Sequence, residues 1–190
     1  MSPDDVRRAL PAWSVVGPKR IEHVARVVAV LERWGADRGV PAGEVERWRR
    51  AALLHDALRD ADAGVLERYG PHPPWPMKTW HGPAAATAAA GDGERDQGVL
   101  DAVRYHSFGY AGWDAAGRML YLADYLEPGR TYERAALDGW LARCAAEPAA
   151  VLREVAAMRI GWRLKTGGPI ALETWEFWNS IVADASSSRA

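Results

Sequence analysis

Cysteine is almost absent from this sequence, because Cys144 is the only one among 190 residues. A single cysteine cannot form an internal disulfide, and it also argues against a structural zinc site built from thiolates. No apolar run approaches the ~20 residues that cross a bilayer. Residues 1–5 lack the basic and apolar segments of a secretory signal. We therefore expect a cytoplasmic protein that has no membrane association.

An excess of charge of either sign is also missing, because the formal net charge is −1. This balance argues against a dominant surface for nucleic acid, although it is compatible with a local basic pocket. The basic stretch Arg47-Trp48-Arg49-Arg50 fits the solvated face of a helix that buries one tryptophan. We expect a small-molecule partner and no nucleic acid.

The period-two alternation of β-strands is missing as well, and no internal repeat is apparent. Apolar residues recur at helical spacing instead, as they do from Ile21 to Leu31. Prolines, glycines and capping residues divide the chain into expected helices at about residues 2–10, 18–35, 41–59, 62–69, 84–90, 99–106, 114–126, 132–147, 148–165 and 169–183. The pattern predicts an all-α fold.

These helices suit one domain over residues 1–185, with a motif-bearing core at about 18–132 and additional C-terminal helices at 133–184. Residues 186–190 are expected to form a frayed tail. Four prolines between residues 71 and 76 predict a rigid loop, on which His72 is expected to be a surface residue. Ten tryptophans fit either core packing or a dimer surface, so a homodimer is one possible assembly.

An imidazole and a carboxylate stand side by side in the sequence Leu53-Leu54-His55-Asp56, directly after an apolar run. Burying such a pair without a partner costs several kcal/mol, and a bound cation offsets that cost. If the run is helical to its end, Arg59 and Asp60 lie one turn further along the same flank. The sequence therefore indicates a cation site at this point.

Further candidate ligands occur on other expected helices or at their ends, and helical folds commonly build metal sites from several helices. These candidates are His23, His81, His106 and Asp124. Imidazole and carboxylate ligands without thiolate favour Fe, Mn or Zn. Six ligands exceed the need of one tetrahedral ion and suit two ions about 3.5–4 Å apart. Taken singly, each histidine is equally well explained as a core or surface residue.

Five short motifs carry a resemblance to a known family. They are Ile-Glu-His-Val-Ala-Arg-Val at 21–27, Leu-Leu-His-Asp at 53–56, His-Gly-Pro at 81–83, Arg-Tyr-His at 104–106 and Leu-Ala-Asp-Tyr-Leu-Glu-Pro-Gly-Arg at 122–130. In this order they resemble the HD superfamily of metal-dependent phosphohydrolases. Over about residues 18–132 the chain is most similar to the YqeK-type branch, the symmetrical dinucleoside tetraphosphate hydrolases.

The resemblance implies a helical bundle with a metal site between its helices. One ion would be held by His23, His55, Asp56 and Asp124, and a second by His81 and His106 with Asp56 as the bridge. Bridging suits a carboxylate, whereas an imidazole donates through one nitrogen at a time. The family typically uses iron, and the same ligands would also accept Mn, Co or Zn.

The implied activity is hydrolysis of diadenosine tetraphosphate to two ADP molecules by a metal-activated water. The resemblance and the charges suggest catalytic roles for Asp56, Arg59 and Asp60. Asp60 would either protonate the leaving phosphate or hold Arg59. The candidate substrate contacts are Arg26, Arg59, Trp80, Arg104, Ser107 and Arg130. Arg26 could instead orient a metal ligand.

Aromatic side chains flank the candidate ligands. They are Trp80, Phe108, Tyr110 and Trp113. Each would either stack on an adenine or pack in the core, and core packing is the more common role of large aromatic residues.

Two departures from the family pattern affect the expected substrate. Arg59 stands where the family usually has lysine, and Ser107-Phe108-Gly109 replaces Thr-Thr-Gly. Arginine keeps the positive charge but presents a planar fork in place of a point charge. Two alternatives therefore stay open: an HD phosphohydrolase that acts on other nucleotides or phosphoesters, and a non-catalytic nucleotide-sensing domain.

Overall fold

The computed structural model describes residues 1–70, 74–130 and 134–187, which contain ten α-helices, one 3₁₀ helix and no strand. The all-α prediction is confirmed. The elements are α1 (Pro3–Ala9), α2 (Pro18–Asp37), α3 (Ala42–Leu54), α4 (Ala63–Glu67), η1 (Met77–Thr79), α5 (His81–Gly91), α6 (Gln97–Tyr105), α7 (Ala115–Leu126), α8 (Arg134–Arg143), α9 (Pro148–Lys165) and α10 (Leu172–Ser187). None of the described helices has the length and apolarity required to span a membrane.

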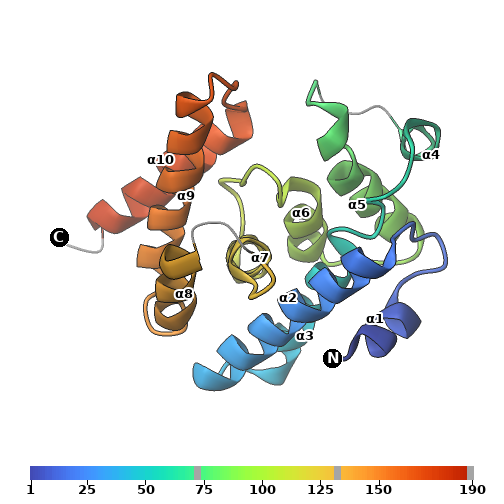
Figure 1. The fold of residues 1–190 in the computed structure, drawn as a ribbon, viewed down its shortest axis with the longest axis horizontal. Coiled ribbons are helices and arrows are strands. Elements are labelled where there is room, and N and C mark those ends of the chain that lie inside the picture. Colours follow the sequence, from blue (N-terminus) through green and yellow to red (C-terminus); the bar gives the residue numbers. More distant parts are fainter. Residues whose placement is uncertain (71–73, 131–133, 188–190) are drawn as a thin grey trace.

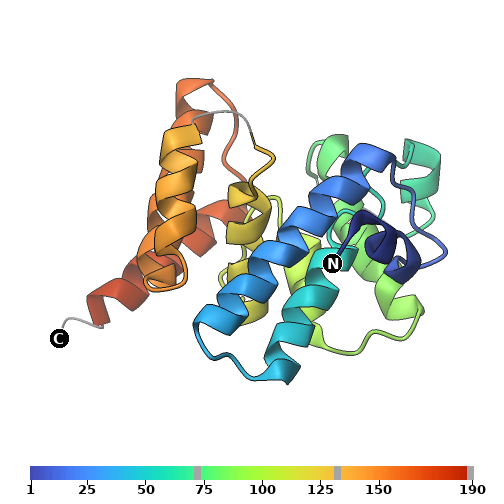
Figure 2. The same cartoon turned by 60° about the horizontal axis from the view of Figure 1, so that its bottom comes forward.

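Helix α7 occupies the centre of the fold. It contacts α2, α3 and α6 on one side and α8 and α9 on the other. Figure 1 shows α7 nearly end-on between these two groups, and Figure 2 shows the C-terminal helices standing together beside it. Leu120, Leu122, Ala123 and Leu126 of α7 are almost fully buried, as expected of a helix that is covered on most of its sides. Asp124, near the end of this helix, is accordingly only 16% exposed.

An arginine network fixes three helices of the core relative to one another. Arg47 on α3 donates to Asp96 Oδ2 at 2.6 Å and to Asp114 Oδ2 at 2.6 Å. The same aspartates cap α6 and α7, because they accept hydrogen bonds from Val99 N and Ala116 N. Arg47 on the expected solvated face is thus 25% exposed and joins α3 to the first turns of α6 and α7.

Helix α3 ends at Leu54, five residues before the predicted end at Arg59. Residues 55–60 form successive turns instead, and their backbone pairs with a distant segment. Val15 N donates to Ala57 O at 2.7 Å, and Asp60 N donates to Val15 O at 3.2 Å. The predicted helical flank shared by residues 55, 56, 59 and 60 is therefore wrong.

Several other helix boundaries differ from the prediction by a few residues, and two of these differences concern the motifs and the expected tail. Helix α5 begins at His81 and not at Ala84, because Pro83 lies in its first turn, where a proline needs no hydrogen-bond partner. Helix α10 continues to Ser187, so two residues of the expected tail are helical. The rest of that tail, His72 and the start of the helix expected at residue 132 lie outside the described residues.

Candidate metal centre

The six predicted metal ligands converge in the interior from five parts of the fold. His23 comes from α2, His81 from α5 and Asp124 from α7, while the other three follow the last turns of α3 and α6. At most 4% of the surface of each of the first five ligands is exposed: His23, His55, Asp56, His81 and His106. The Asp124 side chain is 16% exposed. Such a concentration of buried polar groups requires a compensating partner.

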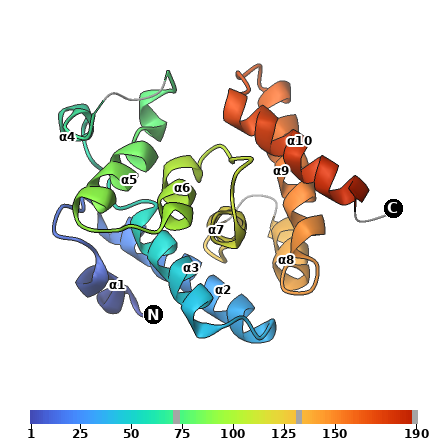
Figure 3. The same cartoon turned by 180° about the vertical axis from the view of Figure 1, so that it is seen from behind.

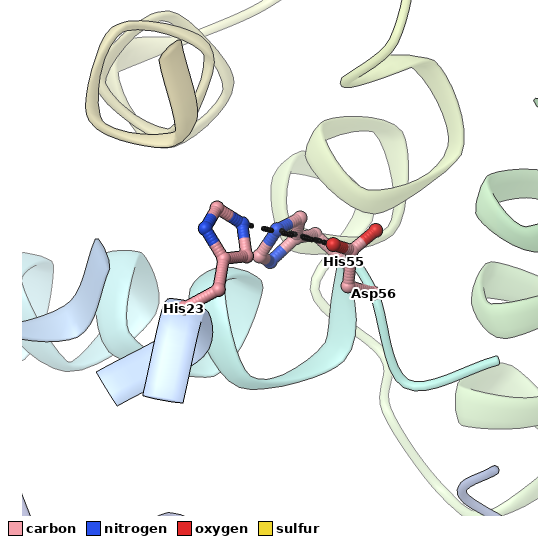
Figure 4. Close-up of side chains that lie close together, drawn as sticks. All are labelled: His23, His55 and Asp56. Carbon is pink, nitrogen blue, oxygen red and sulfur yellow. Dashed lines mark ion pairs between the residues drawn. The ribbon is translucent and has the colours of Figure 1, made fainter. Parts of the chain in front are cut away.

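Asp56 lies between two pairs of histidines. Its Oδ2 is 3.7 Å from His23 Nε2 and 3.5 Å from His55 Nε2, and Figure 4 shows these three side chains facing one another. Its Oδ1 is 3.2 Å from His81 Nε2 and 3.7 Å from His106 Nε2. Two groups of ligand atoms suited to a metal ion therefore meet at one carboxylate.

Asp124 lies beside the first of these groups. Its Oδ1 is 3.1 Å from His23 Nε2 and 3.9 Å from His55 Nε2. Arg130 Nη2 donates to the same oxygen at 2.7 Å and to the Asp124 carbonyl at 2.8 Å. The arginine thus fixes the carboxylate that stands opposite Asp56 across the His23–His55 pair.

The hydrogen bonds of the histidines set their tautomers for metal binding. The Nδ1 atoms of His55, His81 and His106 face the carbonyl oxygens of Ala52, Lys78 and Val103 at 2.7, 3.0 and 2.8 Å. A carbonyl only accepts, so each Nδ1 carries the proton and each Nε2 turns a lone pair inward.

The inward nitrogens need a cation. His81 Nε2 and His106 Nε2 are 3.0 Å apart, so their lone pairs repel each other unless a positive ion lies between or beside them. The Nε2 atom of His55 is buried and has no hydrogen-bond partner within the described chain, and the Nε2 atom of His23 faces only the carboxylate oxygens of Asp124 and Asp56. Unsatisfied buried nitrogens of this kind are costly. The donor set fits metal ions that favour imidazole and carboxylate ligands.

The electrostatics of the centre prepare it for a cation. Burial lowers the pKa of His106 to about 3, helped by the neighbouring His81 and His55 rings. Burial also lowers the pKa of His55. Burial raises the pKa of Asp56, but its interactions with His55 and His81 outweigh this and hold that pKa well below its usual range. At neutral pH, the neutral imidazoles of His55 and His106 therefore lie beside the ionised carboxylate of Asp56, which is the ligand state that metals require.

Glu127, the residue after α7, supports His23 and was missed as a site residue. Its Oε1 is 3.2 Å from His23 Nδ1, and its other oxygen accepts hydrogen bonds from Arg26 Nε and Gly129 N. Glu127 is 2% exposed. Burial raises its pKa, but hydrogen bonds from His23, Arg26 and Gly129 outweigh this and lower the pKa to about 2. A carboxylate that orients a ligand imidazole commonly strengthens its metal binding.

Arg20 is a second site residue that was not predicted. Its Nη1 donates to Asp56 Oδ2 at 2.7 Å, and its side chain is 25% exposed. Arg20 precedes His23 by three residues on α2, so the two side chains share one face of the helix. That spacing was a usable signal. The guanidinium stabilises the ionised form of the carboxylate at the middle of the centre.

Two of the arginines predicted to contact substrate are engaged with carboxylates of the centre. Arg26 binds Glu127, and Arg130 binds Asp124. The contact of Arg26 corresponds to the alternative in which it orients a metal ligand. Arg104 is half-buried on the last turn of α6.

Arg59 and Asp60 make main-chain contacts near the centre. Arg59 Nη1 donates to Lys78 O at 2.8 Å, the carbonyl that also binds His81 Nδ1. Asp60 is exposed, and its Oδ2 accepts a hydrogen bond from Gly17 N, at the start of α2, at 2.7 Å. These contacts connect Arg59 to η1, directly before His81, and Asp60 to the start of the helix that carries His23.

The aromatic residues near the centre mostly pack against protein. Phe108 and Trp113 are buried, and Phe108 lies 4.4 Å from the Trp75 ring. Tyr110 stacks on Tyr105 at 4.4 Å. Trp80, which is half-buried, donates from its indole to Trp75 O at 2.8 Å. The core-packing alternative fits these positions.

Gly82 allows the two helices that carry His81 and His106 to come close. A Cβ atom at this position would lie 2.9 Å from Arg104 O and 3.1 Å from Val103 O. These are backbone atoms, which cannot rotate away. The motif His81-Gly82-Pro83 therefore has a packing reason for its glycine, and this packing brings the second pair of histidines together.

A helical fold with a buried histidine and aspartate centre is the arrangement that defines HD domains, and the sequence model of the HD domain family matches residues 20–129. The chain belongs to this family, and this membership supports the assignment of the protein as a hydrolase. The match covers all six predicted metal ligands and ends before α8.

Two relatives carry the description symmetrical bis(5′-nucleosyl)-tetraphosphatase. The Bacillus subtilis (strain 168) protein is 27% identical over 113 residues, which are 55% of this chain and 57% of that protein. The Staphylococcus aureus (strain NCTC 8325 / PS 47) protein is 27% identical over 127 residues, which are 60% of this chain and 61% of that protein. The chain thus spans less than two thirds of the length of either relative.

A solved structure extends the likeness of the fold to the C-terminal helices. It is a Clostridium acetobutylicum protein described as a predicted HD superfamily hydrolase involved in NAD metabolism. The TM-score is 0.76 at 21% identity, and the superposition covers 97% of this chain and 98% of that one. Helices α8–α10 therefore belong to an architecture that also occurs in another HD protein.

Proposed function

We propose that this protein is a cytoplasmic metal-dependent phosphohydrolase that cleaves diadenosine tetraphosphate-like dinucleotides symmetrically to two nucleoside diphosphates. The observation that carries the proposal is the position of Asp56, whose two oxygens each face a separate pair of histidines. A carboxylate in this position suits a pair of metal ions. The descriptions of the two tetraphosphatase relatives support the choice of substrate class.

The metal ions in this proposal are iron, with Mn, Co and Zn as alternatives that the same ligands accept. His23, His55, Asp56 and Asp124 would hold one ion, and His81, His106 and the shared Asp56 the other. When bound, such a pair of ions lowers the pKa of a water molecule to near neutrality and polarises the phosphoryl group.

The side chains around the ligands have supporting roles in the proposed reaction. Arg20 and Arg130 hold the two carboxylates ionised and oriented. Arg59 donates to the Lys78 carbonyl, and the same carbonyl fixes the tautomer of His81. Arg59 would therefore affect turnover through the metal ligand His81. Ser107 Oγ lies 3.3 Å from His106 Nε2, where it would donate to a phosphate oxygen.

Product analysis tests this function. The metal-loaded protein is incubated with diadenosine tetraphosphate, and the nucleotides are separated by anion-exchange chromatography. ADP as the sole product supports symmetrical cleavage, whereas AMP with ATP contradicts it. Turnover of other nucleotides or phosphoesters alone would favour an HD phosphohydrolase of different specificity.

Two variants connect turnover to the centre. Asp56→Ala should lose bound metal and activity together, because it removes the carboxylate shared by both groups. Asp37→Ala is the matched control, since Asp37 is exposed at the far end of α2. Normal turnover by the Asp56 variant would exclude the proposed centre.

A further inference from the structure

A cavity of about 510 Å³ opens beside the second histidine pair. Its lining includes Ser107, which touches His106, together with Tyr125 of α7, Arg159 of α9 and Thr174 of α10. Figure 3 shows α9 and α10 running side by side next to α7. The volume lies in the range of pockets that bind small molecules, about 300–1,000 Å³.

The charges of the lining select an anion. Three cationic residues line the cavity, namely Lys78, Arg159 and Arg163, and no carboxylate is among its described lining residues. The carboxylates of the metal centre lie beyond Ser107 and are paired with arginines of their own. A ligand that reaches from the centre into this cavity therefore meets positive charge on its way.

Arg159 is positioned by Ser107 and Tyr121 to contact such a ligand. Its Nη2 donates to Ser107 O at 2.9 Å, and its guanidinium carbon lies 4.4 Å from the centroid of the Tyr121 ring. Its Nη1 is buried without a hydrogen-bond partner in the described residues. A buried donor on a charged group is costly when left unpaired, and a phosphate oxygen would satisfy it.

The cavity also offers an exposed aromatic side chain. Trp162, one turn after Arg159 on α9, lines the cavity and is 57% exposed. An exposed indole is a good stacking partner for a purine base, because every base presents a flat π-face. Phosphate chemistry near Ser107 and stacking near Trp162 would together match one nucleoside diphosphate.

We propose that this cavity binds one nucleoside diphosphate half of the substrate, with Arg159 on its phosphates and Trp162 on its base. The inference rests on the proposed function, because it assumes a substrate that extends from the metal centre into the cavity. Both residues lie beyond the 20–129 stretch that matches the family. The C-terminal helices of this chain would thus determine which nucleotide is accepted.

Calorimetric titration of the metal-loaded protein with ADP tests the cavity separately from turnover. Arg159→Gln should raise the dissociation constant for ADP at least about tenfold, as expected for the loss of a hydrogen bond to a charged group. It should leave the weaker binding of adenosine unchanged. Arg153→Gln is the matched control, because Arg153 lies on the same helix and outside the cavity.

A second pair of variants keeps the test valid if Arg159→Gln fails to fold. Trp162→Ala should weaken ADP binding about fivefold or more, in line with the loss of one stacking contact. Trp175→Ala should have no effect, since Trp175 is 58% exposed on α10 and does not line the cavity. Lower melting temperatures without a change in ADP affinity would indicate structural roles and overturn the proposal.

The two proposals fail in different ways. Unchanged ADP affinity in both Arg159→Gln and Trp162→Ala, beside normal cleavage of diadenosine tetraphosphate, would overturn the cavity assignment alone. Weakened ADP binding in both variants would support it, even if the wild-type protein cleaved no dinucleotide. With active enzyme, Arg159→Gln should raise KM about tenfold and leave kcat within about threefold.

Discussion

Replacing Glu127 by glutamine should destabilise the protein in a way that depends on pH. The carboxylate contacts His23 and Arg26 and accepts a third hydrogen bond from Gly129 N at 2.6 Å. Glutamine keeps the shape of the side chain but removes its negative charge. It also replaces one of the two carboxylate oxygens with an NH₂ group. Both oxygens face hydrogen-bond donors, and an NH₂ group cannot accept from a donor.

The magnitude follows from the pKa of Glu127, which lies at about 2 in the folded protein against an ordinary value of 4.5. One pKa unit is worth about 1.4 kcal/mol, so the ionised carboxylate contributes about 3 kcal/mol to the free energy of unfolding at neutral pH. Because the folded pKa is the lower one, this contribution is complete above pH 4.5. It is lost progressively as the pH falls from 4.5 towards 2.

Urea unfolding of the metal-free protein at pH 7, 4 and 3 measures the effect. Glu127→Gln should be less stable than wild type by about 3 kcal/mol at pH 7, and the difference should shrink as the pH decreases. Glu67→Gln, at the exposed end of α4, should change stability by less than about 0.5 kcal/mol. A loss that is equal at all three pH values would refute the electrostatic explanation.

Three further predictions concern the centre and the core. Gly82→Ala should destabilise the protein by about 1–3 kcal/mol in thermal melts, because the added methyl group meets the backbone of α6; a stabilised variant would contradict this close packing. Burial lowers the pKa of His23, but Asp124 and Glu127 outweigh this and raise that pKa. A competition titration should therefore show that metal affinity falls as the pH drops through the pKa of His23. Equal affinity at pH 6 and 8 would argue against His23 as a ligand. Burial raises the pKa of Cys144 to about 12, so the native thiol should resist a disulfide-exchange reagent at pH 8 and react only after unfolding.

The residues of the centre could be predicted because each stands in a short motif on or beside a helix. His55-Asp56 follows an apolar run, and that run is indeed buried in α3. Asp124 lies on a helix that is apolar on most sides, which places it in the interior. Helical periodicity and adjacency are local properties, so the sequence displays them directly.

The support of the centre depends on contacts between distant segments and was therefore not visible in local patterns. The end of α3 is decided by hydrogen bonds to Val15, some forty residues earlier in the chain. Arg159 reaches Ser107 from a helix whose apolar periodicity says nothing about its cationic side chains. Glu127 stood within a quoted motif, but only the fold shows that it faces His23 and Arg26.

The sharing of Asp56 between two metal ions is the central claim, and elemental analysis of the metal-supplemented protein tests it most directly. The wild-type chain should contain about two ions and His106→Ala about one, because His106 faces only the Oδ1 side of Asp56. Asp56→Ala should contain nearly none. A wild-type chain with a single ion, retained in full by His106→Ala, would contradict the two-metal centre.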